Sequence, residues 1–153
     1  MRRFWKFYRY CFELENYLLL VRAAGAALHV RRQLSDNRPS PLLSAAIEAV
    51  ERVYLSRQPK WVISDYAKIP QFAHLVTNFP YAWGKCVQHS LICYRLFNGY
   101  GIPARVCFGI RRSDETGEGH AWVEAADDPN QSLTGPGMPI DRFIPIYKSS
   151  WPE

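Results

Sequence analysis

Residues 86–110, CVQHSLICYRLFNGYGIPARVCFGI, predict a helix, a tight connection and a strand in direct succession. Residues 86–97 suit a helix, and the Asn98-Gly99 pair behind them is a typical C-terminal stop. Gly-Ile-Pro makes the connection, and residues 104–110 follow as a strand. Because successive strand residues point to opposite faces, Val106 and Phe108 share one face of this strand.

A second strand, HAWVEA at residues 120–125, follows a short polar turn, which predicts an antiparallel hairpin with the first strand. His120, Trp122 and Glu124 share one face of it, and the residues between them share the other. After a polar loop, MPIDRFIPIY at residues 138–147 is predicted as a last strand, whose proline suits a sheet edge.

The part of the chain before this stretch is predicted to be helical. Residues 4–34 indicate one long helix, residues 41–56 an amphipathic helix, and residues 61–85 short helix and loop. Apolar side chains recur at helical spacing in the first helix, at Phe7, Tyr10, Leu14, Tyr17 and Val21. The fold class is therefore α+β, a single domain in which a helical region, 1–80, packs on a core, 81–153.

Composition narrows the class of protein. The chain has 153 residues, is 48% hydrophobic and carries a formal charge of +5, which suits one folded domain. Neither zinc-finger spacing nor an RNA-binding signature is present, so nucleic-acid binding is not expected. The spacing of the four cysteines is not that of a small disulfide-stapled domain, and free thiols in a reducing compartment are expected.

The basic, aromatic start, MRRFWKFYRY, does not predict a membrane span or a signal peptide. Glu13, Glu15 and Arg22 interrupt the apolar stretch behind it, which is far shorter than the roughly 20 residues of a span. A cytoplasmic location is expected. The basic segment is either a solvated helix face or a docking surface for a partner.

Cys86 stands where the central helix begins, next to Lys85. Unpaired N–H groups and the positive end of the helix dipole favour a thiolate there. His120, brought against that thiol, can accept its proton, and a carboxylate behind the imidazole would fix the tautomer. The pattern indicates a Cys-His-Asp site with the cysteine on a helix and the other two residues on adjacent strands.

A metal site is the alternative for the same helix. Cys86, His89 and Cys93 fall on one helical stripe and, with His120, can make a four-ligand zinc site. Structural zinc ligands more often come in close pairs, so no metal is expected. Cys93 and Cys107 are predicted to be core residues.

The segment KCVQHSLICYRLFNGYGIPARVCFGIRR followed by GHAWVE resembles the lasso-peptide leader peptidases, transglutaminase-like cysteine proteases of bacteria that take part in antibiotic biosynthesis. The shared elements are a cysteine before an apolar helix with Ser90-Leu91, then Gly-Ile-Pro-Ala, then His-Ala-Trp-Val-Glu. The resemblance covers about residues 80–147. It implies a papain-like fold in which Cys86 is the nucleophile and His120 the general base.

The third catalytic residue is chosen by the same resemblance. Asp141, in the segment similar to the closing strand of the family, is preferred to Asp127 and Asp128, which sit at a turn before Pro129. The loop from Asp128 to Pro136 resembles an insertion. Glu124 is expected to pair with an arginine instead. Trp83 and Trp122 are candidate substrate-binding residues.

The resemblance also implies partners. Residues 1–80 show no hairpin signal, so a separate leader-recognition protein is expected, together with the precursor's leader peptide and an ATP-consuming macrolactam synthetase. No Walker-type glycine loop occurs, so no cofactor is expected in this chain. The expected reaction is removal of the leader from a ribosomally made lasso precursor. Amide transfer and a non-catalytic scaffold, with or without zinc, remain as alternatives.

Overall fold

The computed structural model describes residues 13–36, 47, 61, 63–77, 85–111, 118–126, 132–134 and 140–151, and the fold is given for these residues. The elements are α2 (Leu14–Asp36), η1 (Tyr66–Lys68), α4 (Ile69–Thr77), α5 (Lys85–Gly99), β1 (Ala104–Arg111), β2 (Glu118–Ala125), η2 (Ile140–Arg142) and β3 (Ile144–Lys148). Helices followed by a small antiparallel sheet confirm the α+β fold class.

The three strands form one antiparallel sheet in the order β2-β1-β3. The predicted β1–β2 hairpin is confirmed, with Val106 opposite Val123 and Gly109 opposite His120. The prediction that the His strand and the closing strand are neighbours is wrong, because both pair with β1. Pro145 lacks a backbone N–H and suits an edge strand, which places β3 on the outer side of β1 as predicted.

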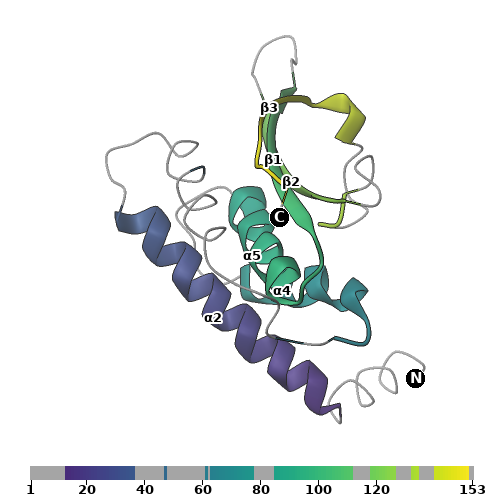
Figure 1. Ribbon diagram of the computed structural model, residues 1–153. Coiled ribbons are helices and arrows are strands. Elements are labelled where there is room, and N and C mark those ends of the chain that lie inside the picture. The colour runs from purple at the N-terminus through teal and green to yellow at the C-terminus, as the bar shows by residue number, and fades with distance from the viewer. Residues whose placement is uncertain are drawn as a thin grey trace, which may run out of the picture.

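α5 lies between the sheet and α2 (Figure 1), and one core joins the three layers. The sheet therefore has two different faces. The α5 face carries Val106, Phe108, Ala121 and Val123, which belong to the main core. On the opposite side, which we call the η2 face, Cys107 and Trp122 pack with Phe143 and partly buried Ile140.

The C-terminal end of α5 differs slightly from the predicted stop. The helix runs to Gly99, and the residue with a left-handed backbone is Gly101, with φ of 72°. At Gly99 a Cβ atom would stand 2.5 Å from the ring of Trp61. Gly99 is therefore needed for close packing, and Gly101 for the turn into β1.

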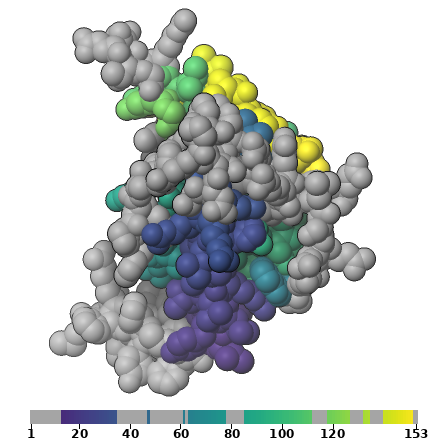
Figure 2. All heavy atoms as spheres, turned by 90° about the vertical axis from the view of Figure 1, so that its left-hand side faces the viewer, coloured from purple at the N-terminus to yellow at the C-terminus, as the bar shows by residue number. Residues whose placement is uncertain are grey.

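α2 packs on α5 through a stripe of small and aliphatic residues. The buried residues of this stripe are Leu19, Ala23, Ala26, Ala27, Val30 and Leu34. Leu14, Tyr17 and Val21, whose spacing predicted the helix, are instead exposed. Figure 2 shows α2 in purple and blue on the surface of the molecule. Small alanines let two helices approach closely, so they decide which side of α2 meets the core.

The structure describes only part of the segments that the remaining N-terminal predictions concern. Short helix within 61–85 is confirmed by η1 and α4, and Asp65 caps η1 by accepting a hydrogen bond from the Ala67 N–H. Of the predicted helix over 41–56 only Ile47 is described; it is helical and packs on the core. The division at residue 80 stays a prediction. Within the described ranges no helix combines the length and apolar character that crossing a bilayer requires.

Candidate active site

Cys86 lies in the first turn of α5, as predicted, and its free thiol is partly exposed. The backbone N–H groups of a first helical turn have no partner within the helix. They point toward the start of the helix and carry the positive end of its dipole. The position therefore favours negative charge on the sulfur or on an oxygen that binds beside it.

α5 is anchored on β2 beside His120. Ser90, which is fully buried and lies one helical turn after Cys86, donates a hydrogen bond of 2.8 Å from Oγ to the carbonyl oxygen of Ala121. Residues four apart lie on the same side of a helix. This bond therefore sets the side of α5 that carries Cys86 against the backbone of the strand that carries His120, whose side chain points to the opposite face of the sheet. Between the described atoms of these two side chains no hydrogen bond forms.

The imidazole of His120 lies against two aromatic rings on the η2 face. Its ring centroid is 4.9 Å from that of Phe143 and 6.1 Å from that of Trp122. Burial lowers the pKa of His120, because the charged form loses hydration there. The neutral ring is therefore the favoured form, and it can accept a proton.

Asp141 does not lie where the sequence suggested. The predicted strand over 138–147 begins only at Ile144, and Asp141 belongs to the exposed 3-10 turn η2. Within the described residues no hydrogen bond or ion pair joins its carboxylate to His120. Phe143, two residues later, brings η2 to the histidine. The structure thus gathers Asp141 on the His120 side of the sheet, and its catalytic role stays a prediction.

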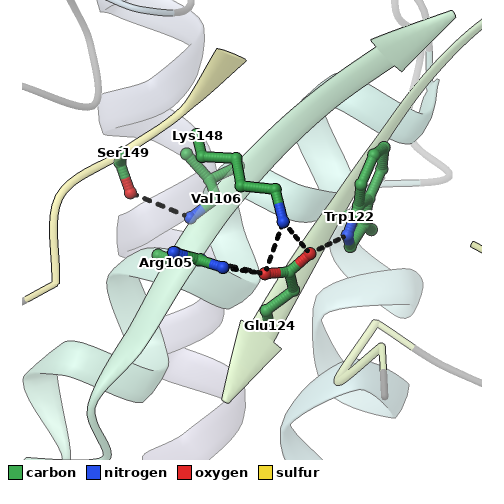
Figure 3. A network of polar contacts seen from close by, with 6 residues as sticks. All are labelled: Arg105, Val106, Trp122, Glu124, Lys148 and Ser149. Atoms are coloured by element: carbon green, nitrogen blue, oxygen red, sulfur yellow. Dashed lines mark hydrogen bonds and ion pairs between the residues drawn. The ribbon is translucent and has the colours of Figure 1, made fainter. Parts of the chain in front are cut away.

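Glu124 forms the strongest polar cluster in the described structure (Figure 3). It is only 2% exposed, and its Oε2 accepts hydrogen bonds of 2.9 and 2.7 Å from Arg105, which confirms the predicted arginine pair. Oε1 accepts from Trp122 Nε1 at 2.9 Å and from Lys148 Nζ at 3.2 Å. Burial raises the pKa of Glu124, but these hydrogen bonds outweigh it and lower the pKa overall.

Two residues of this region were not identified from the sequence pattern. Lys148 reaches Glu124 from β3, and Phe143 reaches His120 from the residue before β3. The arginine pair follows from register, because Arg105 stands directly opposite Glu124. Lys148 stands opposite Cys107, so only the β1–β3 register shows that it can reach the same carboxylate.

The other predicted residues have clear positions. Trp122 is 2% exposed, so its indole is buried. Substrate contact by Trp122 stays a prediction. Cys93 and Cys107 are buried core residues, as predicted. Burial raises the pKa of Cys93, and burial with the nearby Glu124 carboxylate raises that of Cys107 to about 12. Both thiols stay protonated and unreactive. Trp83, Asp127, Asp128 and Cys11 lie outside the described residues.

On the helical stripe that the zinc alternative requires, His89 contacts its neighbours in the fold. His89 Nε2 lies 3.1 Å from the Pro70 carbonyl oxygen and 3.7 Å from Cys93 Sγ. In the described part of the chain, no three histidine, cysteine or acidic side chains are grouped so that they can hold a metal ion.

Comparison with known proteins supports the coarse assignment. A family model described as the transglutaminase-like superfamily matches residues 17–148, which include most of the predicted helical region, 1–80, as well as the sheet. Comparisons with curated proteins and with solved structures give no significant match. The superfamily is typically enzymatic, with cysteine protease or acyltransferase members. Because the family match covers most of its length, the chain belongs to the transglutaminase-like superfamily.

Proposed function

We propose that the chain is a cysteine peptidase that removes the leader from a ribosomally made lasso-peptide precursor. The observation that carries the proposal is the anchoring of the Cys86 helix on the His120 strand through Ser90 and Ala121. Membership of the transglutaminase-like superfamily supports a cysteine acyl-transfer reaction. The motifs around Gly-Ile-Pro-Ala and His-Ala-Trp-Val-Glu support the leader peptidases within it.

The reaction we propose has two acyl-transfer steps. His120 takes the thiol proton while Cys86 Sγ attacks the carbonyl carbon of the last leader residue. The Cys86 backbone N–H and a second donor hold the oxyanion. His120 then gives its proton to the leaving amine, the C–N bond breaks, and a thioester remains. Water, deprotonated by His120, releases the leader as a carboxylate, and the thiol regains its proton.

His120 suits both roles in this scheme. Burial holds its pKa below the ordinary value, so the ring starts as a neutral base. Asp141, exposed in η2, is the proposed orienting carboxylate, and we propose that it meets the second ring nitrogen when substrate binds. Triad hydrogen bonds in free enzymes often tighten only when substrate binds.

The proposed partners follow from the same resemblance. The substrate is the precursor's leader and core peptide, presented by a separate small recognition protein. The freed amine then serves a macrolactam synthetase that consumes ATP. The proposed location is the cytoplasm, where the three described cysteines, which are all free thiols, would stay reduced.

The test is mass spectrometry of a precursor peptide incubated with the chain and a recognition protein. Cys86→Ala should lower turnover by about four orders of magnitude or more, since the nucleophile is lost. The matched control is Cys93→Ala on the same helix, where the thiol is buried and protonated. Cys93→Ala should retain activity.

Near wild-type cleavage by Cys86→Ala would overturn the cysteine mechanism. The product masses also distinguish peptide cleavage from amide transfer, the alternative reaction that is compatible with the superfamily match. A shortened core peptide with a free amine supports peptidase action. A crosslinked product or loss of ammonia, with no shortened peptide, would replace peptidase action by amide transfer.

A further inference from the structure

The imidazole of His120 contacts two aromatic rings that come from different elements and that also contact each other. Trp122, two residues along β2, lies nearly parallel to it, with an interplanar angle of 15° and centroids 6.1 Å apart. Phe143, between η2 and β3, is tilted by 31° at 4.9 Å. The two aromatic rings are themselves 6.3 Å apart. All three rings therefore form one cluster on the η2 face.

Gly109 makes room for this arrangement. It stands opposite His120 in the β1–β2 register. A Cβ atom on Gly109 would lie 2.8 Å from Trp122 Cη2 and 2.9 Å from the Ile144 carbonyl oxygen. Real Cβ contacts are not this short, so a side chain here would push away the indole or the start of β3. The indole lies across β1 only because this residue is glycine.

Glu124 fixes the far side of the same indole. Its carboxylate accepts the Trp122 Nε1 hydrogen bond and is held in turn by Arg105 and Lys148 (Figure 3). The indole can therefore neither rotate about its own bonds nor slide along the strand without losing a buried hydrogen bond. The indole beside His120 is thus linked through Glu124 to side chains from all three strands.

We propose, on the basis of the function proposed above, that the ring contacts of Phe143 and Trp122, together called the aromatic clamp, hold the His120 ring in the orientation proton transfer requires. Phe143 is then a positioning residue of the reaction, and Glu124 acts through Trp122. A histidine side chain has two rotatable bonds, and a general base is efficient only when its ring nitrogen points at the proton. The clamp removes that freedom before substrate arrives.

The first arm of the test compares two phenylalanines on opposite faces of the sheet. Phe143→Leu keeps an apolar side chain but removes the ring beside His120. The control, Phe108→Leu, removes an equally buried ring that stacks on Tyr147 on the α5 face. We expect Phe143→Leu to lower kcat by about 10- to 100-fold, the scale of a misplacement near 1 Å, with little change in KM. Phe143→Tyr should restore kcat, and Phe108→Leu should leave it unchanged.

The second arm needs no activity. The ring-proton NMR signals of His120, assigned with His120→Gln, should show ring-current shifts in the wild-type chain. These shifts should be reduced in Phe143→Leu and kept in Phe108→Leu. Should Phe143→Leu not fold, Phe143→Met takes its place in both arms.

The two arms separate the clamp from the function on which it rests. If the wild-type chain cleaves the precursor and Phe143→Leu has the same kcat as Phe108→Leu, the clamp is wrong and the peptidase function stands. If the wild-type chain cleaves no precursor, the function fails, and the NMR arm alone decides the clamp. His120 signals that are identical in wild type and Phe143→Leu would overturn it in either case.

Discussion

The two faces of β2 are made by neighbouring residues and yet are held together in different ways. Val123 points to the α5 face and is fully buried among apolar side chains. Glu124, the next residue, is 2% exposed on the η2 face and is surrounded by two cations and an indole N–H. Burial stabilises Val123 without a specific partner, whereas it stabilises Glu124 only if every partner is present.

This difference explains where the candidate site lies. The α5 face tolerates exchange of one apolar side chain for another of similar volume, so its side chains fix the fold without a specific orientation. The η2 face fixes particular side chains in particular orientations through hydrogen bonds and ring contacts. His120, whose function depends on orientation, is found on the η2 face.

The largest expected effect comes from removing the carboxylate of the η2 face. Glu124→Ala leaves Arg105, Lys148 and the Trp122 N–H without their common partner, and we expect a loss of about 3–5 kcal/mol in the free energy of unfolding. Urea denaturation measures it. The control is Glu118→Ala, which removes the exposed ion pair with Arg111 on the same two strands and should cost less than about 1 kcal/mol. Equal losses for the two variants would mean that the η2 face needs no specific partners.

The next effect is on turnover, and it tests whether η2 belongs to the reacting side of the sheet. Asp141→Asn keeps the shape but favours the wrong tautomer of His120, and a loss of roughly one to three orders of magnitude is expected, less than in a serine enzyme. Single-turnover cleavage of the precursor measures it. Asp127→Asn and Asp128→Asn should each stay close to wild type. If one of those two is indispensable and Asp141→Asn is silent, the orienting carboxylate lies in the loop instead.

A smaller effect is expected on the α5 face. Val123→Ala removes two buried methyl groups and should cost about 2 kcal/mol of stability. The His120 ring lies on the η2 face, opposite Val123, so kcat of the folded protein should not change. Thermal unfolding and precursor cleavage, run on the same sample, measure both. A fall in kcat that exceeds the unfolded fraction would show that the two faces are coupled.

The smallest effect is a pH dependence on the η2 face. The folded pKa of Glu124 lies below its ordinary value of 4.5, so the fold favours the carboxylate over the neutral acid. Its contribution to stability is complete above 4.5 and is lost as the pH falls through the lowered folded pKa. Glu124→Gln, which keeps an acceptor for Trp122, should therefore show a weaker acid dependence of unfolding than wild type. Parallel pH profiles of the two proteins would contradict the lowered pKa.

The sequence by itself determined the elements whose signals are local. α5, the turn after it, the β1–β2 hairpin and the proline-bearing edge strand follow from periodicity, turn residues and the missing N–H of Pro145. It also placed Cys86 at a helix start and paired Glu124 with an arginine, because both depend only on neighbours in the chain or on hairpin register.

Only the tertiary structure decided the rest. β1 lies between the other strands, and the alanine side of α2 faces the core. Asp141 lies in a 3-10 turn, and Lys148 and Phe143 reach the η2 face. The physical reason is that these contacts join residues whose separation in the chain carries no signal. They depend on which edge of β1 receives β3 and in what register, and that choice is made by packing and buried hydrogen bonds together.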